Sequence, residues 1–333
     1  MQPNTTRRAV LAAALVAPAI ARAETAIPVT LQMNWFGSGD HAPLFLAKRA
    51  GLYAAEGLDV TIQRGTGSAD AARRVELKQA EFGIADAPTT IAAVAKGANI
   101  VMLAVIFDKA ANNAFFRRSR GFQGAKDFAG RKVAVAPADS HRVVWPAFAR
   151  SQGLEPGAIT FVNVRPEGKQ AIVASGDVDL AFDLYSGYPL WEKALGKDDV
   201  GHLLWADAGF NLYGLCYVAH RDTVREKPGL CRRFLAATHR GWAATARDPK
   251  AAVDAMVAES GAGLDGPTLL ATMPYVLELC VTERSRENGL GWMLPELMQA
   301  TLDITASGGT LEKVPPLEGL YTNAFNSRIR PAT

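Results

Sequence analysis

The sequence lacks an apolar run of the ~18–20 residues that a membrane-spanning helix needs. The nearest approach among its 333 residues is residues 9–21, a stretch of small and aliphatic residues broken only by Pro18. Two arginines precede this stretch, and Ala-Arg-Ala at 21–23 follows it with small residues where a signal peptidase cleaves. The pattern predicts a signal peptide over residues 1–23. This segment would direct export of the mature chain to the periplasm by the Sec or the twin-arginine (Tat) route.

Cysteine is also scarce. Cys216, Cys231 and Cys280 are widely spaced, with no C-x-x-C pair and no zinc-ligand spacing. This excludes the common zinc and dithiol motifs. Two interpretations stay open: three buried thiols that pack as small apolar groups, or one disulfide formed in an oxidising compartment with one thiol left over.

The chain has no strong excess of charge of either sign. It holds 36 Lys and Arg against 33 Asp and Glu, and residues 1–23 contain three of the arginines and no acid. The remainder is therefore balanced, with 33 basic and 33 acidic side chains. A neutral body offers no electrostatic footprint for nucleic acid or for an anionic membrane surface.

The familiar catalytic motifs are missing as well. The sequence contains no G-x-S-x-G, H-E-x-x-H or G-x-x-x-x-G-K-[ST], and its five histidines show no paired spacing. We therefore expect no catalytic site, no metal centre and no bound cofactor, and a binding protein becomes the first hypothesis.

Short apolar runs alternate with helical patterns through the first two thirds of the chain, which is typical of an α/β fold with mainly parallel sheets covered on both faces. Strands are expected at residues 29–33, 60–63, 82–85, 100–106, 132–136, 159–164 and 180–182. Helices are expected at residues 41–55, 69–79, 89–96, 142–152 and 169–174, and an almost wholly helical region at 224–308.

A weak internal similarity suggests two lobes. Residues 81–86 and 178–183 each run through a short apolar strand into an aspartate, Asp86 and Asp183. Residues 110–117 and 208–217 are placed where extended chain passes to a second lobe and returns. The expected division is residues 24–112 with 216–333 in one lobe and residues 113–215 in the other.

Candidate binding residues follow the predicted strands, because ligands of open α/β sheets bind at the carboxyl ends of the strands. An aromatic side chain, a helix-initiating histidine, a Gly-Ser turn before a helix, two aspartates and two tyrosines occupy such places. They are Trp35, His41, Gly67, Ser68, Asp86, Asp183, Tyr185 and Tyr188. An anionic ligand would instead require a cation in the cleft, for which Arg73, Lys109, Arg117 and Arg142 are available.

Several short segments in sequence order carry a family resemblance. Asn34-Trp35 is followed by HAPLFLAK from His41 and by EGLDV at 56–60. Further segments are EFGI at 81–84, DFAGRK at 127–132, GWM at 291–293 and YTNAF at 321–325. Together they resemble the NMT1/THI5-like periplasmic solute-binding proteins.

This resemblance implies a type II-like periplasmic binding protein with two hinge-linked lobes, a monomer that delivers a small-molecule ligand to an inner-membrane ABC permease. Branches of the family take pyrimidine precursors of thiamine, riboflavin, sulfonates, taurine, nitrate or aromatic carboxylates. In the pyrimidine branch the position of Trp35 stacks on the ring and the loop at Gly67-Ser68 lines the cleft. A carboxylate that often follows a tyrosine like Tyr185 has no clear counterpart, since Asp183 and Glu192 both lie nearby.

The same family has an enzyme branch that makes the thiamine pyrimidine from its own histidine and pyridoxal phosphate, in an iron-dependent reaction. Its cluster of cysteines is missing here. A binding protein is therefore expected, with the pyridoxal-phosphate-dependent synthase as the remaining alternative.

Overall fold

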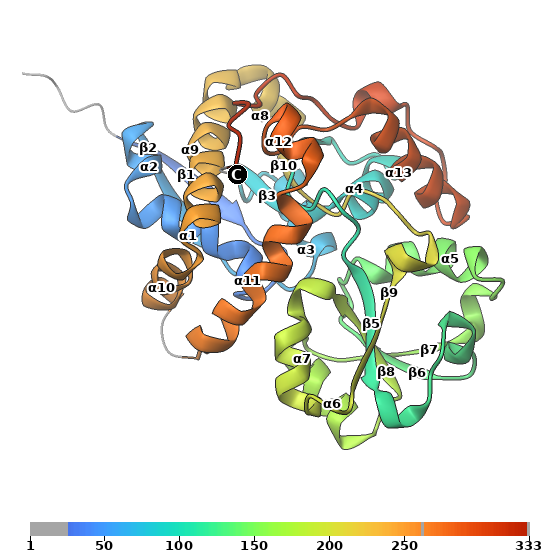
Figure 1. Cartoon of the computed structure of the whole chain (residues 1–333). Coiled ribbons are helices and arrows are strands. Elements are labelled where there is room, and N and C mark those ends of the chain that lie inside the picture. Colours follow the sequence, from blue (N-terminus) through green and yellow to red (C-terminus); the bar gives the residue numbers. More distant parts are fainter. Residues whose placement is uncertain (1–25, 261–262, 332–333) are drawn as a thin grey trace, which may run out of the picture.

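The computed structural model describes residues 26–260 and 263–331. The predicted signal peptide lies outside the described residues. Two five-stranded sheets form the centres of two lobes, placed at the upper left and lower right of Figure 1. We call the first sheet and its helices lobe 1, and the second sheet and its helices lobe 2. The α/β class and the two-lobed architecture expected from the sequence are confirmed.

The first sheet has the order β2-β1-β3-β10-β4. Its strands are β1 (Ile27–Gln32), β2 (Leu58–Gln63), β3 (Phe82–Asp86), β4 (Ile100–Val105) and β10 (Leu215–His220). The second sheet has the order β7-β6-β8-β5-β9. Its strands are β5 (Asn112–Arg117), β6 (Lys132–Val135), β7 (Thr160–Asn163), β8 (Leu180–Leu184) and β9 (Val200–Leu204).

Each sheet contains one reversed strand, and that strand is the one by which the chain enters the lobe. β5 pairs antiparallel with β8 and β9 after the chain leaves lobe 1, and β10 pairs antiparallel with β3 and β4 after it returns. All other pairs are parallel. The segments expected to link the lobes are thus extended, and they continue directly into the centre of each sheet.

The internal similarity corresponds to equivalent strands. β3 and β8 both hold the middle position of their sheet, with two parallel strands on one side and the reversed strand on the other. Asp86 ends β3, and Asp183 is the next-to-last residue of β8. The two aspartates therefore lie at matching edges of the two lobes.

Helices cover both faces of each sheet. In lobe 1 they are α1 (Ala42–Arg49), α2 (Leu52–Ala55), α3 (Ser68–Glu76), α4 (Ala87–Ala95), α8 (Arg221–Glu226), α9 (Pro228–Arg247), α10 (Pro249–Ser260), α11 (Gly266–Cys280), α12 (Glu283–Asn288) and α13 (Pro295–Ser307). In lobe 2 they are α5 (His141–Ser151), α6 (Lys169–Ser175) and α7 (Tyr188–Leu195). Among the described residues, no helix combines the length and the apolar character needed to cross a membrane.

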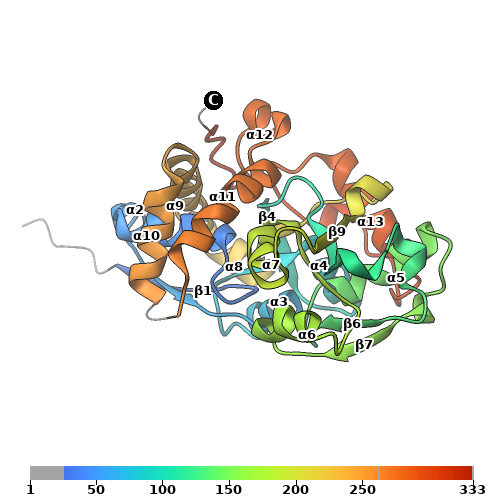
Figure 2. The same ribbon diagram turned by 60° about the horizontal axis from the view of Figure 1, so that its bottom comes forward.

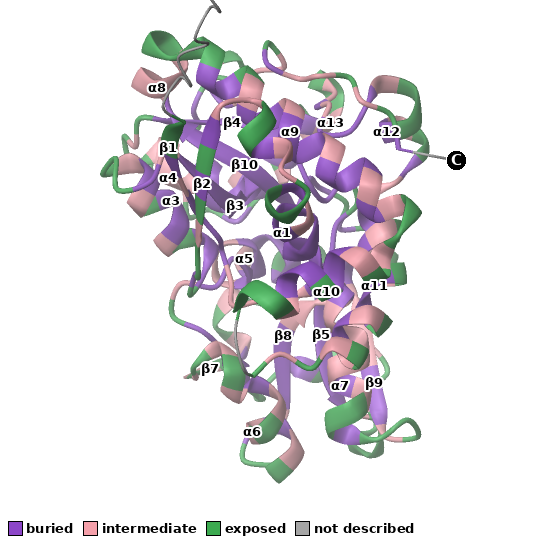
Figure 3. Cartoon of the chain, turned by 90° about the vertical axis from the view of Figure 1, so that its left-hand side faces the viewer, coloured by how far each residue is buried: buried purple, intermediate pink, exposed green. Residues whose placement is uncertain are grey.

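The cores explain why central strands are apolar throughout. β3, β4 and β10 are buried along their whole length (Figure 3), because helices pack on both sides of the sheet. Phe82, for example, stacks on Phe234 of α9 with ring centroids 4.0 Å apart. On the other face Val218 packs in a cluster with Val75 of α3 and Met298 of α13.

One sequence prediction on helices needs correction. The expected helix at 41–55 is divided into the single turn η1 (Gly39–His41) and the helices α1 and α2. The break falls at Gly51, whose φ of 68° is left-handed and ends α1. The helix α7 and the strand β9 were not expected from the sequence.

The lobes touch along both sides of the space between them. Helix α11 packs against α7, and α13 packs against both α4 and α5 (Figures 1 and 2). Ion pairs join Arg64 to Glu167 and Lys193 to Asp265. The described conformation is thus a closed one.

Candidate functional site

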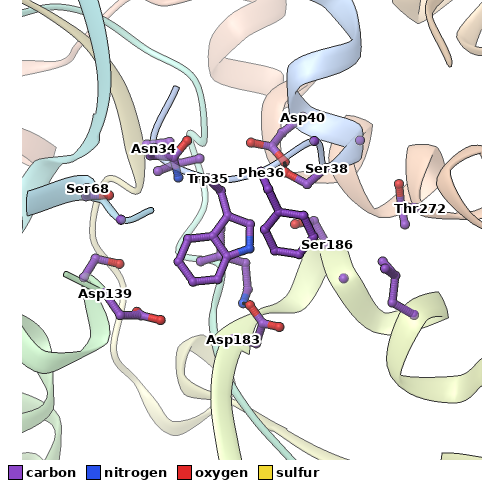
Figure 4. Close-up of a pocket in the computed structure, with 18 of the residues that line it drawn as sticks. Asn34, Trp35, Phe36, Ser38, Asp40, Ser68, Asp139, Asp183, Ser186 and Thr272 are labelled. Atoms are coloured by element: carbon purple, nitrogen blue, oxygen red, sulfur yellow. Dashed lines mark hydrogen bonds between the residues drawn. The ribbon is translucent and has the colours of Figure 1, made fainter. Parts of the chain in front are cut away.

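A cavity lies where the carboxyl ends of the two sheets face each other (Figure 4). From lobe 1 it is lined by Asn34, Trp35, Phe36, Gly37, Ser38, Gly39, Asp40, Gly67, Ser68, Leu215 and Thr272. From lobe 2 it is lined by Asp139, Ser140, His141, Gln170, Asp183, Leu184, Ser186, Gly187 and Leu190. The site therefore needs both lobes.

Trp35 occupies the centre of this cavity, on the loop that follows β1. The buried imidazole of His41 contacts this loop at two points. Its Nε2 lies 3.0 Å from Asn34 Oδ1, and its Nδ1 accepts from the Ser38 backbone N–H at 3.3 Å. His41 thus fixes the shape of the loop that presents Trp35, and it is itself absent from the cavity wall.

The Gly67-Ser68 turn forms the next part of the wall and begins α3. It lies against lobe 2, since the Ala69 N–H donates to the Ala138 carbonyl at 3.3 Å. A Cβ added at Gly67 would fall 2.6 Å from Ala138 Cβ and closer still to the Ala138 carbonyl. This approach requires glycine, because a real Cβ atom does not come within 3.0 Å of its neighbours.

A buried charged network forms the lobe 2 side of the cavity. The Lys169 ammonium donates to Asp139 Oδ2 at 2.6 Å and to the Phe182 carbonyl at 2.8 Å, and lies 3.6 Å from Asp183 Oδ1. His141 Nδ1 is 2.7 Å from the other oxygen of Asp139. The same ammonium lies 4.6 Å from the ring centroid of Trp35, so this contact crosses from one lobe to the other.

The pKa values in this network favour the charged forms. Burial alone would raise the pKa of Asp139, but Lys169 and His141 outweigh it and hold that pKa well below its usual value. Burial alone would lower the pKa of Lys169, but Asp139 and Asp183 outweigh it and hold that pKa above its usual value. Lys169 and Asp139 therefore form a buried ion pair at neutral pH.

Asp86 lies behind the wall, next to Ser68, whose hydroxyl oxygen accepts from the Asp86 backbone N–H at 3.1 Å. Its carboxyl is buried, and Oδ1 has no hydrogen-bond partner. Burial raises the pKa of Asp86 to about 7, partly opposed by a hydrogen bond from the Thr89 backbone and reinforced by the charge of Asp139. Asp86 is thus a buried acid that keeps its proton up to about neutral pH.

We expect Asp86 to make stability fall as pH rises. Between about pH 4 and pH 7 the folded chain keeps a proton that the unfolded chain releases, so the free energy of unfolding decreases, by roughly 4 kcal/mol over the range. Asp86→Asn removes this contribution, so the free energy of unfolding of the variant increases relative to that of the wild type as pH rises. Urea unfolding of both proteins at pH 5, 6.5 and 8 measures the difference, and a constant difference would contradict the account.

The eight residues predicted from the sequence fall into two groups. Trp35, Gly67, Ser68 and Asp183 line the cavity; His41, Asp86, Tyr185 and Tyr188 do not. Tyr185 and Tyr188 lie beside the Ser186-Gly187 wall and contact Tyr275 of α11, with centroid distances of 5.3 and 5.6 Å. These two tyrosines bridge the lobes next to the cavity.

The charged network was not predicted from the sequence. Asp139, His141 and Lys169 are not adjacent in sequence, and His141 was treated as an isolated histidine. A usable signal was present, since Asp139-Ser140-His141 follows β6 as Trp35 follows β1, and β6 and β1 hold equivalent positions in their sheets.

The cysteines are all buried and none is bonded to another, in line with packing as small apolar groups.

The closed cavity is small. It leaves about 70 Å³ for the centres of water-sized molecules. A dry cavity that holds benzene measures about 150 Å³. Entry of a ring therefore requires Trp35 to move or the lobes to separate.

The sequence matches the NMT1/THI5-like family over residues 38–252, well over half of the chain. The chain belongs to the NMT1/THI5-like family. The resemblance seen in the sequence is thereby confirmed, and the cavity of this NMT1/THI5-like protein lies largely within the matched region. The wall residues outside the matched region are residues 34–37, which precede it, and Thr272, which follows it.

Two curated relatives have different names. A 4-amino-5-hydroxymethyl-2-methylpyrimidine phosphate synthase of Legionella pneumophila is 24% identical over 68% of this chain and 72% of its own length. The riboflavin-binding protein RibY of Chloroflexus aurantiacus is 24% identical over 94% of this chain and 90% of its own.

Among solved structures, the periplasmic aliphatic sulphonate binding protein SsuA of Escherichia coli is similar, with a TM-score of 0.68. It is 16% identical and covers 88% of this chain and 91% of its own. At this identity the likeness is one of fold.

Proposed function

We propose that this NMT1/THI5-like protein is an extracytoplasmic solute-binding protein. It captures a small planar heterocycle, similar to a pyrimidine precursor of thiamine, and delivers it to an ABC permease of the inner membrane. The proposed lobes are those expected from the sequence, residues 24–112 with 216–333 and residues 113–215, except that Asn112 belongs to β5 of lobe 2 and Leu215 to β10 of lobe 1. The proposed location is the periplasm.

One observation carries the proposal: the cavity is built from the carboxyl ends of both sheets, with the indole of Trp35 at its centre. A ligand in such a place contacts both lobes and favours the closed state, since only differential affinity shifts a population. An indole offers a flat apolar face to a ring, and the surrounding hydroxyl, amide and carboxylate groups offer hydrogen bonds that fix its orientation.

The synthase alternative is not supported by the residues around the cavity. Pyridoxal phosphate is held by a lysine whose neutral amine forms an imine. Lys169 is the lysine nearest to Trp35, and it is buried, hydrogen-bonded to Asp139, and has a raised pKa. No lysine or arginine is among the described residues that line the cavity. The site therefore does not fit this cofactor.

We expect Trp35→Ala to weaken binding of 4-amino-5-hydroxymethyl-2-methylpyrimidine by tenfold or more. Stacking contributes about 0.5–1.5 kcal/mol beyond the buried area, and a tenfold change is about 1.4 kcal/mol. Titration calorimetry on the wild type, Trp35→Ala and Trp35→Phe measures the effect, with Phe retaining part of the affinity. Trp292→Ala, which removes an indole outside the cavity, is the matched control. Equal affinity of Trp35→Ala and wild type would refute ring stacking at this position.

A further inference from the structure

We infer that the cavity selects its ligand by charge: it takes a neutral or positively charged ring with N–H donors and excludes anions. This deepens the proposed function and rests on it. It also sets this chain apart from the sulphonate-binding protein that shares its fold.

The charges in the cavity wall are one-sided. Asp40 comes from lobe 1, and Asp139 and Asp183 come from lobe 2. Among the described wall residues there is no lysine or arginine. A fourth carboxyl, Asp86, lies just behind the wall, but it adds little negative charge because burial raises its pKa to about 7.

Lys169 is the cation next to the wall, and two of its N–H donors are already hydrogen-bonded within lobe 2. Of the three N–H groups of a lysine ammonium, one is directed to Asp139 Oδ2 and one to the Phe182 carbonyl. Asp183 Oδ1 lies 3.6 Å away on a third side. Lys169 faces both Asp139 and Asp183, and its single positive charge compensates one of the three carboxylates, so the wall keeps an excess of negative charge.

The cations that the sequence offered for an anion lie elsewhere. Arg117 pairs with Asp199 at 2.7 Å, and Lys109 lies 3.5 Å from Glu278. Arg142 donates to the Ala136 carbonyl at 2.9 Å and stacks over Phe161 at 4.7 Å. Arg73 lines a separate groove between α3 and α4. None of the four is in the cavity wall.

The wall offers an acceptor to a ligand that carries N–H donors. Asp183 is the acceptor best placed for a ligand, because its side chain is 17% exposed whereas those of Asp139 and Asp40 are nearly fully buried. A ring amine or an exocyclic ammonium can donate to it.

Three ligands that share one ring test the inference at pH 7.5. They are 4-amino-2-methylpyrimidines with a 5-hydroxymethyl group (neutral), a 5-aminomethyl group (cationic) and a 5-hydroxymethyl phosphate ester (anionic). We expect the cationic and neutral rings to bind at least 100-fold more tightly than the phosphate ester, measured by titration calorimetry. Ethanesulfonate, an anion without a ring, should not bind at millimolar concentration.

Charge variants sharpen the test. Asp183→Asn should weaken binding of the 5-aminomethyl ring by at least tenfold and leave or improve that of the phosphate ester. Asp198→Asn makes the same change of net charge at an exposed site in the same lobe and should alter neither. The inference is overturned if the wild type binds the phosphate ester or ethanesulfonate as tightly as the 5-aminomethyl ring. If no ring binds and ethanesulfonate does not bind either, the proposed ring ligand fails while the exclusion of anions stands.

Discussion

Lys169→Met will destabilise the protein by about 3–5 kcal/mol at pH 7.5, because it leaves Asp139 buried without its main counter-charge. Lys169 is 1% exposed and Asp139 is 5% exposed, so water cannot replace the lost partner. Methionine nearly preserves the shape of the side chain, so the loss reports on charge more than on packing. Urea unfolding followed by circular dichroism measures the change.

A double variant separates the buried charge from other causes. Lys169→Met with Asp139→Asn has no uncompensated carboxylate, and we expect it to recover most of the lost stability. The single variant should also recover as pH falls, because an isolated buried Asp139 takes up a proton more readily. A loss below about 1 kcal/mol for Lys169→Met, or a double variant as unstable as the single one, would contradict the role of Lys169 as the counter-charge of Asp139.

Gly67→Ala will weaken ligand binding at least 100-fold while leaving the folded lobes intact. The new methyl group would overlap the Ala138 backbone of lobe 2, so it opposes only the closed arrangement. Small-angle scattering at saturating ligand should give the larger, open radius of gyration, whereas the wild type should contract. Gly157→Ala is the matched control, because a Cβ there meets no atom within 4 Å. Normal closure of Gly67→Ala would contradict the assigned contact between the lobes.

The sequence predicts the cavity-lining residues that lie on a single element. Trp35 and Gly67 follow apolar strands, and the carboxyl end of a strand is where α/β lobes bind ligands, so their positions follow from local pattern alone. Asp183 was found for the same reason, through the similarity of residues 81–86 and 178–183. The two halves of the chain repeat one sheet topology, which makes such matches informative.

The network around Lys169 could not be predicted in this way. Lys169 and Asp139 are 30 residues apart on the α6 and β6 sides of lobe 2, and a lysine at the start of a helix is ordinarily a surface residue. Lys169 can be buried because the Asp139 carboxylate and the Phe182 carbonyl both accept hydrogen bonds from its ammonium. Only the folded sheet brings these two acceptors together. His41 and Asp86 illustrate the opposite error: both follow the strand-end rule, yet neither lines the cavity. The His41 imidazole contacts Asn34 on the loop of Trp35, and Asp86 contacts Ser68 through its backbone N–H.

A ring held between the two lobes should stay bound to this chain during purification. Mass spectrometry of the small molecules released by denaturing the purified native protein detects it. We expect one nitrogen-containing aromatic ring compound, neutral or cationic, bound one to one and reduced at least tenfold in Trp35→Ala protein prepared in the same way. A sulfonate or another anion without a ring, retained equally by Trp35→Ala, would contradict it.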